Sequence, residues 1–215
     1  SDIITVAERT ESDRWVLSKL NTLIKLADAG LEDYDLTGTA RAIQEFVTAD
    51  LSNWYVRLNR KRFWKGEYNE DKKAAYQTLF ECLFTVAKLS SPFAPFYFER
   101  VFQDLNSVSN LEEVKSIHLS NFPVADDHII DEDLEARMAL AQKTTSLAHS
   151  LRKGESIKVR QPLSKILIPI ANEEQKARIN AVADLIKTEI NVKDIEFVDD
   201  ASGILVKSVK ANFKV

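Results

Sequence analysis

Cysteine, glycine and proline are all scarce in this chain of 215 residues. Cys82 is the only cysteine, which excludes a disulfide within the chain and a cysteine-rich zinc site, and which fits a reducing compartment. With five glycines and five prolines, long disordered linkers are not expected. No apolar run is long enough to span a bilayer, and the first residues lack the pattern of a signal peptide. We therefore expect a cytoplasmic protein without a membrane segment.

The first half of the chain has the apolar spacing of helices. Hydrophobic residues make up 45% of the sequence, enough to bury a core. Apolar residues recur every three or four positions, with Ser12 or Asp13 as the expected cap of the first helix. The expected helices are 12–31, 39–64, 69–90 and 96–105. The third is apolar around most of its circumference, which predicts a place at the centre of the bundle. Short connections favour antiparallel neighbours.

After residue 105 the sequence becomes polar and rich in turns, and its periodicity changes. Alternation of apolar and polar residues predicts strands, and longer periodic segments predict helices. We expect strands near 116–119, 156–170, 192–200 and 203–215, and helices near 131–152 and 172–190. The predicted fold class is α+β. An antiparallel helical bundle over residues 1–120 is followed by a small α/β domain over residues 121–215.

Positive charge and aromatic rings gather in LSNWYVRLNRKRFW, residues 51–64, although the formal net charge of the chain is −4. On a helical wheel at about 100° per residue, one side is apolar and the adjacent side is basic. Cations neutralise phosphates and flat rings stack on unpaired bases, so this face favours looped RNA over duplex. The alternative is an ordinary solvated face, because nucleic-acid-binding domains are usually basic.

Five segments carry a resemblance to a known family. They are SDRWVLSKLN, DLSNWYVRLNRKRFW, AAYQTLFECLFTVAKLSSPFAPFYFE, SIHLSNFP and IKVRQPLSKILI, in this order. Together they resemble the C-terminal part of the isoleucyl-tRNA synthetases, which are class I aminoacyl-tRNA synthetases. NWYVRLNRKRFW followed by KVRQPL is typical of the isoleucyl family, whereas the SPFAP turn and the WY helix are shared more loosely with valyl and leucyl relatives.

The resemblance implies a helical anticodon-binding domain followed by a small junction domain. The implied partners are the anticodon stem-loop of isoleucine tRNA and the catalytic and editing domains of the same chain. Phosphate contacts are assigned to cations of the basic helix, and base stacking to its last aromatic ring. Trp54 and Tyr55 would fix this helix against the bundle. The implied tRNA-binding residues of the helix are Arg57, Arg60, Lys61, Arg62 and Trp64.

A second candidate surface lies in KGESIKVRQPL, residues 153–163. Here Lys158 and Arg160 alternate with apolar residues, so a strand would direct both charges to one face. In the resembled family this segment belongs to the junction domain, which makes both residues candidate tRNA contacts. An exposed strand edge guarded by charge explains the same pattern equally well.

The catalytic signatures of the resembled family, HIGH and KMSKS, are absent from this sequence, and so is a glycine-rich phosphate loop. The three histidines do not have the spacing of metal ligands. We expect no catalytic residue, metal or cofactor here, with ATP and Mg²⁺ belonging to the parent enzyme, which ligates isoleucine to its tRNA. Two alternatives stay open: a helical protein-interaction module, and the equivalent region of a valyl- or leucyl-tRNA synthetase.

Overall fold

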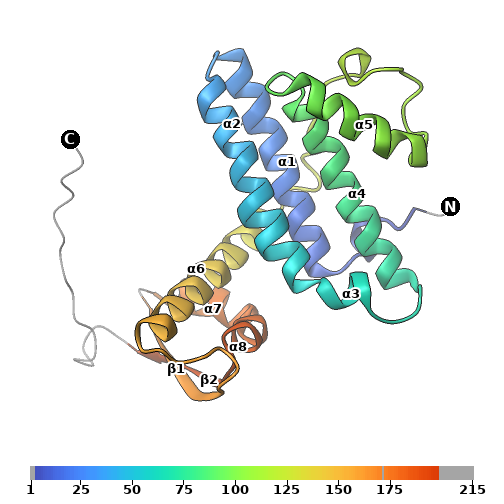
Figure 1. The fold of residues 1–215 in the computed structure, drawn as a ribbon. Coiled ribbons are helices and arrows are strands. Elements are labelled where there is room, and N and C mark those ends of the chain that lie inside the picture. The colour runs from blue at the N-terminus through green and yellow to red at the C-terminus, as the bar shows by residue number, and fades with distance from the viewer. Residues whose placement is uncertain (1–2, 171, 199–215) are drawn as a thin grey trace. The chain divides into compact units, whose positions relative to one another are not determined.

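A computed structural model describes residues 3–170 and 172–198 of the chain (Figure 1). The contacts within it divide the chain into two compact units, Ser1–Glu135 and Ala136–Val215. The first is helical and the second combines helices with a small sheet, so the predicted α+β fold is confirmed. The predicted domain boundary at residue 120 stays a prediction.

Helices packed side by side build the N-terminal unit (Figure 1). α1 packs against α2, its continuation and α4, and α4 packs against α5. The bounds are α1 Glu11–Glu32, α2 Leu36–Glu45, a π-helix Phe46–Val56, α3 Arg60–Trp64, α4 Glu70–Ser90 and α5 Pro95–Ser109. Short 3-10 helices span Val6–Glu8 and Ile117–Leu119, and α6 begins at Glu132 and ends at Gly154.

One stretch of α1 is covered on every side. Its consecutive residues Trp15 to Ser18 are all at most 1% exposed. α4 contacts α1, α2, α3 and α5, which agrees with the expected place at the centre of the bundle, although it exposes Tyr76 and Leu83. Thr10 rather than Ser12 caps α1, because Thr10 and Asp13 form a reciprocal capping box.

The expected single helix 39–64 is divided in the structure. After α2 the chain widens into the π-helix Phe46–Val56, and Asn59 (φ −91°, ψ 11°) interrupts the winding before α3. The π-helix buries Phe46, Asp50, Leu51, Trp54 and Tyr55. The regular wheel drawn from the sequence therefore does not describe this segment.

The connection after α5 contains a 3-10 turn where a strand was expected at 116–119. Glu99 accepts hydrogen bonds from the backbone N–H of Ile117 at 2.9 Å and from the hydroxyl of Ser116 at 3.0 Å. Ile117 is buried in a cluster with Phe84 and Phe102. Tertiary packing thus overrides the local strand pattern.

The C-terminal unit contains a parallel pair of strands, β1 Leu163–Pro169 and β2 Val192–Val198, joined through α7 Glu173–Ala181 and α8 Ala183–Ile190. The pairing register places Leu163 opposite Val192. Val182 (φ −114°, ψ 16°) divides the helix that was expected over 172–190. The strand expected over 203–215 lies outside the described residues.

Candidate nucleic-acid interface

Exposed cations and an exposed ring lie together on and just before α3. Arg57, Arg60 and Lys61 are exposed, and Trp64 is 68% exposed. On a helix, Trp64 neighbours Arg60 at a spacing of four and Lys61 at a spacing of three, so α3 presents ring and charge side by side. Arg57 lies over the ring of Trp54, with its guanidinium 5.5 Å from the ring centroid. The basic aromatic face expected from the sequence is thus open to solvent.

Aromatic residues behind Trp64 anchor this face. The ring of Phe63 is buried and meets the rings of Trp64 at 5.9 Å, Tyr76 at 5.4 Å and Tyr55 at 6.2 Å, each edge to face. The hydroxyl of Tyr76 donates to the carbonyl of Phe63 at 3.0 Å. These contacts hold the end of α3 against α4 while the ring of Trp64 stays accessible.

Two exposed tyrosines near Trp64 did not appear among the site residues expected from the sequence. Tyr68 is 72% exposed in the link between α3 and α4, and Tyr76 is 45% exposed on α4. Tyr76 also donates a hydrogen bond to Phe63, so it connects α4 with the end of α3. Tyr68 could have been found from the sequence, because it is an aromatic residue in a polar connection that directly follows the basic segment.

Arg62 points to the interior side of α3, away from the role expected for it. Its side chain is only 15% exposed, and its Nη2 lies 2.8 Å from Oδ2 of Asp13 and 2.9 Å from Oδ1 of Asp71. Burial alone would lower the pKa of Arg62, but hydrogen bonds and charge from both carboxylates raise it. The structure therefore does not place Arg62 with the exposed cations.

Trp54 and Tyr55 are buried beneath the basic segment, at 4% and 0% exposure. The hydroxyl of Tyr55 donates to Oδ1 of Asp13 at 2.5 Å, and burial together with the charge of Asp13 raises the pKa of Tyr55. The burial of Trp54 and Tyr55 is the burial expected of residues that fix this helix against the bundle.

The carboxylate of Asp13 makes part of the unit's stability depend on pH. Burial opposes its ionisation, but hydrogen bonds from Arg62, Tyr55 and Thr10 outweigh burial and hold the pKa of Asp13 below 3.8. Its contribution to stability is therefore fully present above pH 3.8 and is lost as the pH falls through the lowered pKa. We expect the difference in unfolding free energy between wild type and Asp13→Asn to narrow toward about pH 2. Urea unfolding followed by tryptophan fluorescence measures this difference, and parallel pH profiles would contradict the expectation.

Lys158 and Arg160 are exposed, but they lie in a turn and not in the expected strand. The N–H of Gln161 donates to the carbonyl of Lys158 at 3.0 Å, and β1 begins only at Leu163. Two residues before Lys158, Ser156 has φ 57°, a left-handed conformation that does not continue the helical winding of α6 into the turn. The prediction of a strand through Lys158 and Arg160, with both charges on one face, is therefore wrong.

Buried Arg152 holds this turn, a role that no local pattern around it indicates. It is 4% exposed, and its guanidinium donates to carbonyls of the turn and of the end of α8. Nη1 lies 3.1 Å from the carbonyls of Lys158 and Gln161, while Nη2 lies 2.7 Å from that of Ile190 and 3.1 Å from that of Asn191. One side chain thus fastens both segments together.

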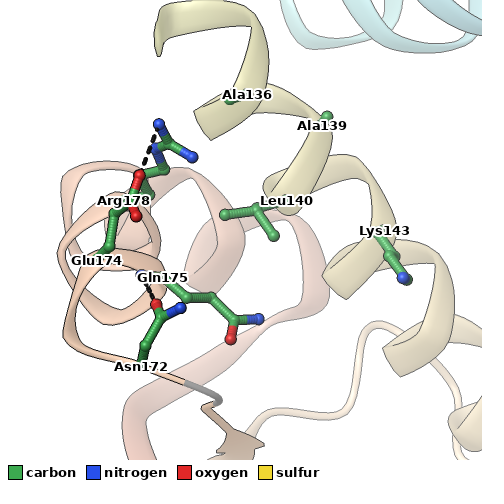
Figure 2. A pocket seen from close by; sticks show the side chains of 8 residues that line it. All are labelled: Ala136, Ala139, Leu140, Lys143, Asn172, Glu174, Gln175 and Arg178. Carbon is green, nitrogen blue, oxygen red and sulfur yellow. Dashed lines mark hydrogen bonds and ion pairs between the residues drawn. The ribbon is translucent and has the colours of Figure 1, made fainter.

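A hollow of about 440 Å³ lies between α6 and α7 in the C-terminal unit (Figure 2). Leu140 projects into it from α6, and polar side chains of α7 form its other wall. Among these, Asn172 caps α7 and Arg178 pairs with Glu174 at 3.0 Å. These groups stabilise the helix that carries them.

Within residues 3–170 and 172–198 no three His, Cys, Asp or Glu side chains come close enough together to hold a metal ion. In the same part of the chain, no helix combines the length and the apolar character needed to cross a membrane.

Comparison with known proteins bears on both the basic segment and the turn. The family model of the anticodon-binding domain of tRNA ligase matches residues 13–167. Similar curated proteins include isoleucine–tRNA ligases of Cytophaga hutchinsonii (59% identical over 98% of this chain), Bacteroides thetaiotaomicron (56% over 98%) and Dehalococcoides mccartyi (40% over 95%). The chain spans 19%, 18% and 20% of the length of these ligases, respectively. With its helical unit, its exposed basic face and this match over most of its length, the chain belongs to the family of anticodon-binding domains of tRNA ligases.

Proposed function

We propose that this chain binds the anticodon stem-loop of isoleucine tRNA as part of an isoleucine–tRNA ligase. The observation that carries the proposal is the exposure of Arg57, Arg60 and Lys61 beside the open ring of Trp64. Membership of a family of anticodon-binding domains supports tRNA as the partner, and the similarity to isoleucine–tRNA ligases supports isoleucine tRNA.

The two kinds of side chain divide the work of binding. Arg57, Arg60 and Lys61 contact phosphates, which fixes the position of the loop without reading its sequence. The ring of Trp64 stacks on a base of the loop, because bases there are not held inside a duplex. Lys158 and Arg160, on their turn, add phosphate contacts from the C-terminal unit.

In the parent ligase this binding supports chemistry at a distant site. Holding the anticodon end of a tRNA helps to position its acceptor end, so that remote binding energy promotes aminoacylation. The parent reaction ligates isoleucine to its tRNA in the cytoplasm with ATP and Mg²⁺, in the catalytic domain, and the same chain carries an editing domain. The part played by the residues described here is recognition.

The proposed specificity is tested with the chain and a set of isolated stem-loops. We expect the isoleucine anticodon stem-loop to bind more tightly than stem-loops in which the anticodon bases are changed one at a time. Stem-loops with valine and leucine anticodons are the matched competitors, and an unrelated hairpin measures non-specific binding. Equal affinity for all of them would leave a general RNA-binding module, and no binding to any would favour a protein-interaction module.

Replacing Trp64 by alanine isolates the stacking contribution. Stacking of a base on an aromatic ring contributes about 1–3 kcal/mol, so we expect Trp64→Ala to weaken stem-loop binding by roughly tenfold or more. The dependence of affinity on salt should not change, because no cation is removed. Trp64→Phe keeps a ring and should retain most of the affinity. Fluorescence anisotropy with a labelled stem-loop measures all three proteins, and an unaltered affinity in Trp64→Ala would remove the stacking role.

A further inference from the structure

α3 cannot hold its own position. It has five residues, Arg60–Trp64, whereas isolated helices shorter than about 12–15 residues are marginal in water. Asn59 leaves the helical conformation on one side, and Gly66 has φ 78° on the other. The direction in which its side chains project therefore depends on contacts with the rest of the unit.

The strongest polar contact of α3 is made with α1, through Asp13. This carboxylate is fully buried and accepts two hydrogen bonds from Arg62, at 2.9 Å from Nη1 and 2.8 Å from Nη2. Its other bonds come from the hydroxyls of Tyr55 at 2.5 Å and Thr10 at 2.7 Å, and from the backbone N–H of Thr10 at 3.2 Å. Asp13 thus connects the start of α1, the π-helix and α3.

Arg62 also reaches the first turn of α4. Its Nε lies 3.0 Å from Oδ2 of Asp71, and its Nη2 donates to the backbone carbonyl of Asp71 at 3.0 Å. A guanidinium fork matches carboxylates in two directions at once, and an ammonium group does not. Because two carboxylates flank it, little of its positive charge is left for a phosphate.

From these contacts we infer that Asp13 and Arg62 form a positioning pair for the RNA-binding face, an inference that rests on the proposed function. Arg62 is fixed toward α1 and α4, and the adjacent ring of Phe63 is fixed in the core. Two anchored neighbours set the rotation of α3 about its axis. Arg60, Lys61 and Trp64 are therefore directed outward before any RNA arrives.

An electrostatic effect and a loss of positioning would change the RNA affinity of Asp13→Asn in opposite directions. Asp13→Asn removes a negative charge near the basic face, which by electrostatics alone would strengthen RNA binding. If the pair positions α3, the same change weakens binding, because α3 holds the competent arrangement for less of the time. A competent fraction of about one tenth would raise the apparent dissociation constant about tenfold. Glu67→Gln is the matched control, since Glu67 is exposed in the α3–α4 link and its removal changes only charge.

Arg62→Lys provides a second variant that keeps the charge. We expect it to weaken stem-loop binding by about fivefold to tenfold with an unchanged salt dependence, because the fork is lost and no phosphate contact is. A direct phosphate contact at this position would instead leave affinity nearly unaltered in Arg62→Lys. Circular dichroism of each variant establishes that the helices are retained.

Hydrogen exchange in the free protein tests whether α3 is held in place before RNA binds. The N–H groups of Arg62 and Phe63 donate to the carbonyl of Asn59, and that of Lys65 donates to Lys61. We expect these three amides to exchange about tenfold faster in Asp13→Asn and Arg62→Lys, and at the wild-type rate in Glu67→Gln.

The outcomes separate the two proposals. The positioning pair is supported if Asp13→Asn and Arg62→Lys both bind RNA more weakly and both exchange the amides of α3 faster. Glu67→Gln should then bind RNA equally well or slightly more tightly. Tighter binding in Asp13→Asn, or unchanged exchange at α3, overturns it while the RNA-binding function stands. If the wild-type chain bound no stem-loop, the proposed function would fail and the positioning pair with it.

Discussion

Replacement of Arg57, Arg60 and Lys61 together by glutamine is expected to weaken binding of the anticodon stem-loop by roughly 100-fold at about 0.1 M salt. Each phosphate contact to a single strand releases about 0.7 of a counterion, and the release is worth about a factor of five at that salt concentration. Loss of three contacts should also flatten the plot of log affinity against log salt by about two. Filter binding across a salt series measures both quantities.

A matched control removes the same charge elsewhere. Arg41, Arg100 and Lys115 are exposed cations of the N-terminal unit that lie outside residues 51–69. Their joint replacement by glutamine changes the net charge by the same amount, and we expect it to leave the salt slope nearly as in the wild type. If the two triple variants behaved alike, affinity would reflect overall charge, and the assignment of phosphate contacts to α3 would be wrong.

A large loss of stability is expected in the C-terminal unit when Arg152 is replaced by alanine. Its guanidinium is the donor to carbonyls at residues 158, 161, 190 and 191. A buried group deprived of its partner costs about 1–3 kcal/mol, so we expect Arg152→Ala to lower the unfolding free energy of this unit by roughly 3–5 kcal/mol. Arg152→Lys should be intermediate, because an ammonium group cannot serve all four acceptors.

The measurement must report the correct unit. Trp15, Trp54 and Trp64 all lie in the N-terminal unit, so tryptophan fluorescence follows that unit alone. Hydrogen exchange of β1 and β2 amides in increasing urea follows the other. Neighbouring Lys153 is exposed, and Lys153→Ala is expected to leave strand exchange unchanged. Unchanged exchange in Arg152→Ala as well would contradict the anchoring role.

Local sequence signals predicted the helices whose ends have caps. Asn69 accepts a hydrogen bond from the N–H of Lys72 at the start of α4, and Asp131 accepts one from Leu134 at the start of α6. A short polar side chain before an apolar run is the usual local sign of such a cap. Such signals lie within a few residues of one another, and they survive folding because nothing distant competes with them.

The parts that were missed depend on distant partners. Arg62 meets a carboxylate 49 residues earlier in the chain, and Arg152 meets carbonyls up to 39 residues later. No local pattern distinguishes such an arginine from an exposed one. The same holds for the strand expected through Lys158, where the turn depends on Arg152 and on a positive φ at Ser156. The exposure of the cations of α3 was predicted correctly, because an exposed side chain does not depend on a contact with a distant part of the chain.

The π-helical winding of Phe46–Val56 limits the insertions and deletions that this segment tolerates. The buried residues at its end, Trp54 and Tyr55, keep their direction toward the bundle only while the number of residues in those turns is kept. One inserted or deleted residue there would turn Tyr55 away from Asp13 and so disturb the contacts that place α3, without altering any group proposed to meet RNA. Length variation among relatives should therefore collect in the link 65–69 and be rare in the π-helical turns.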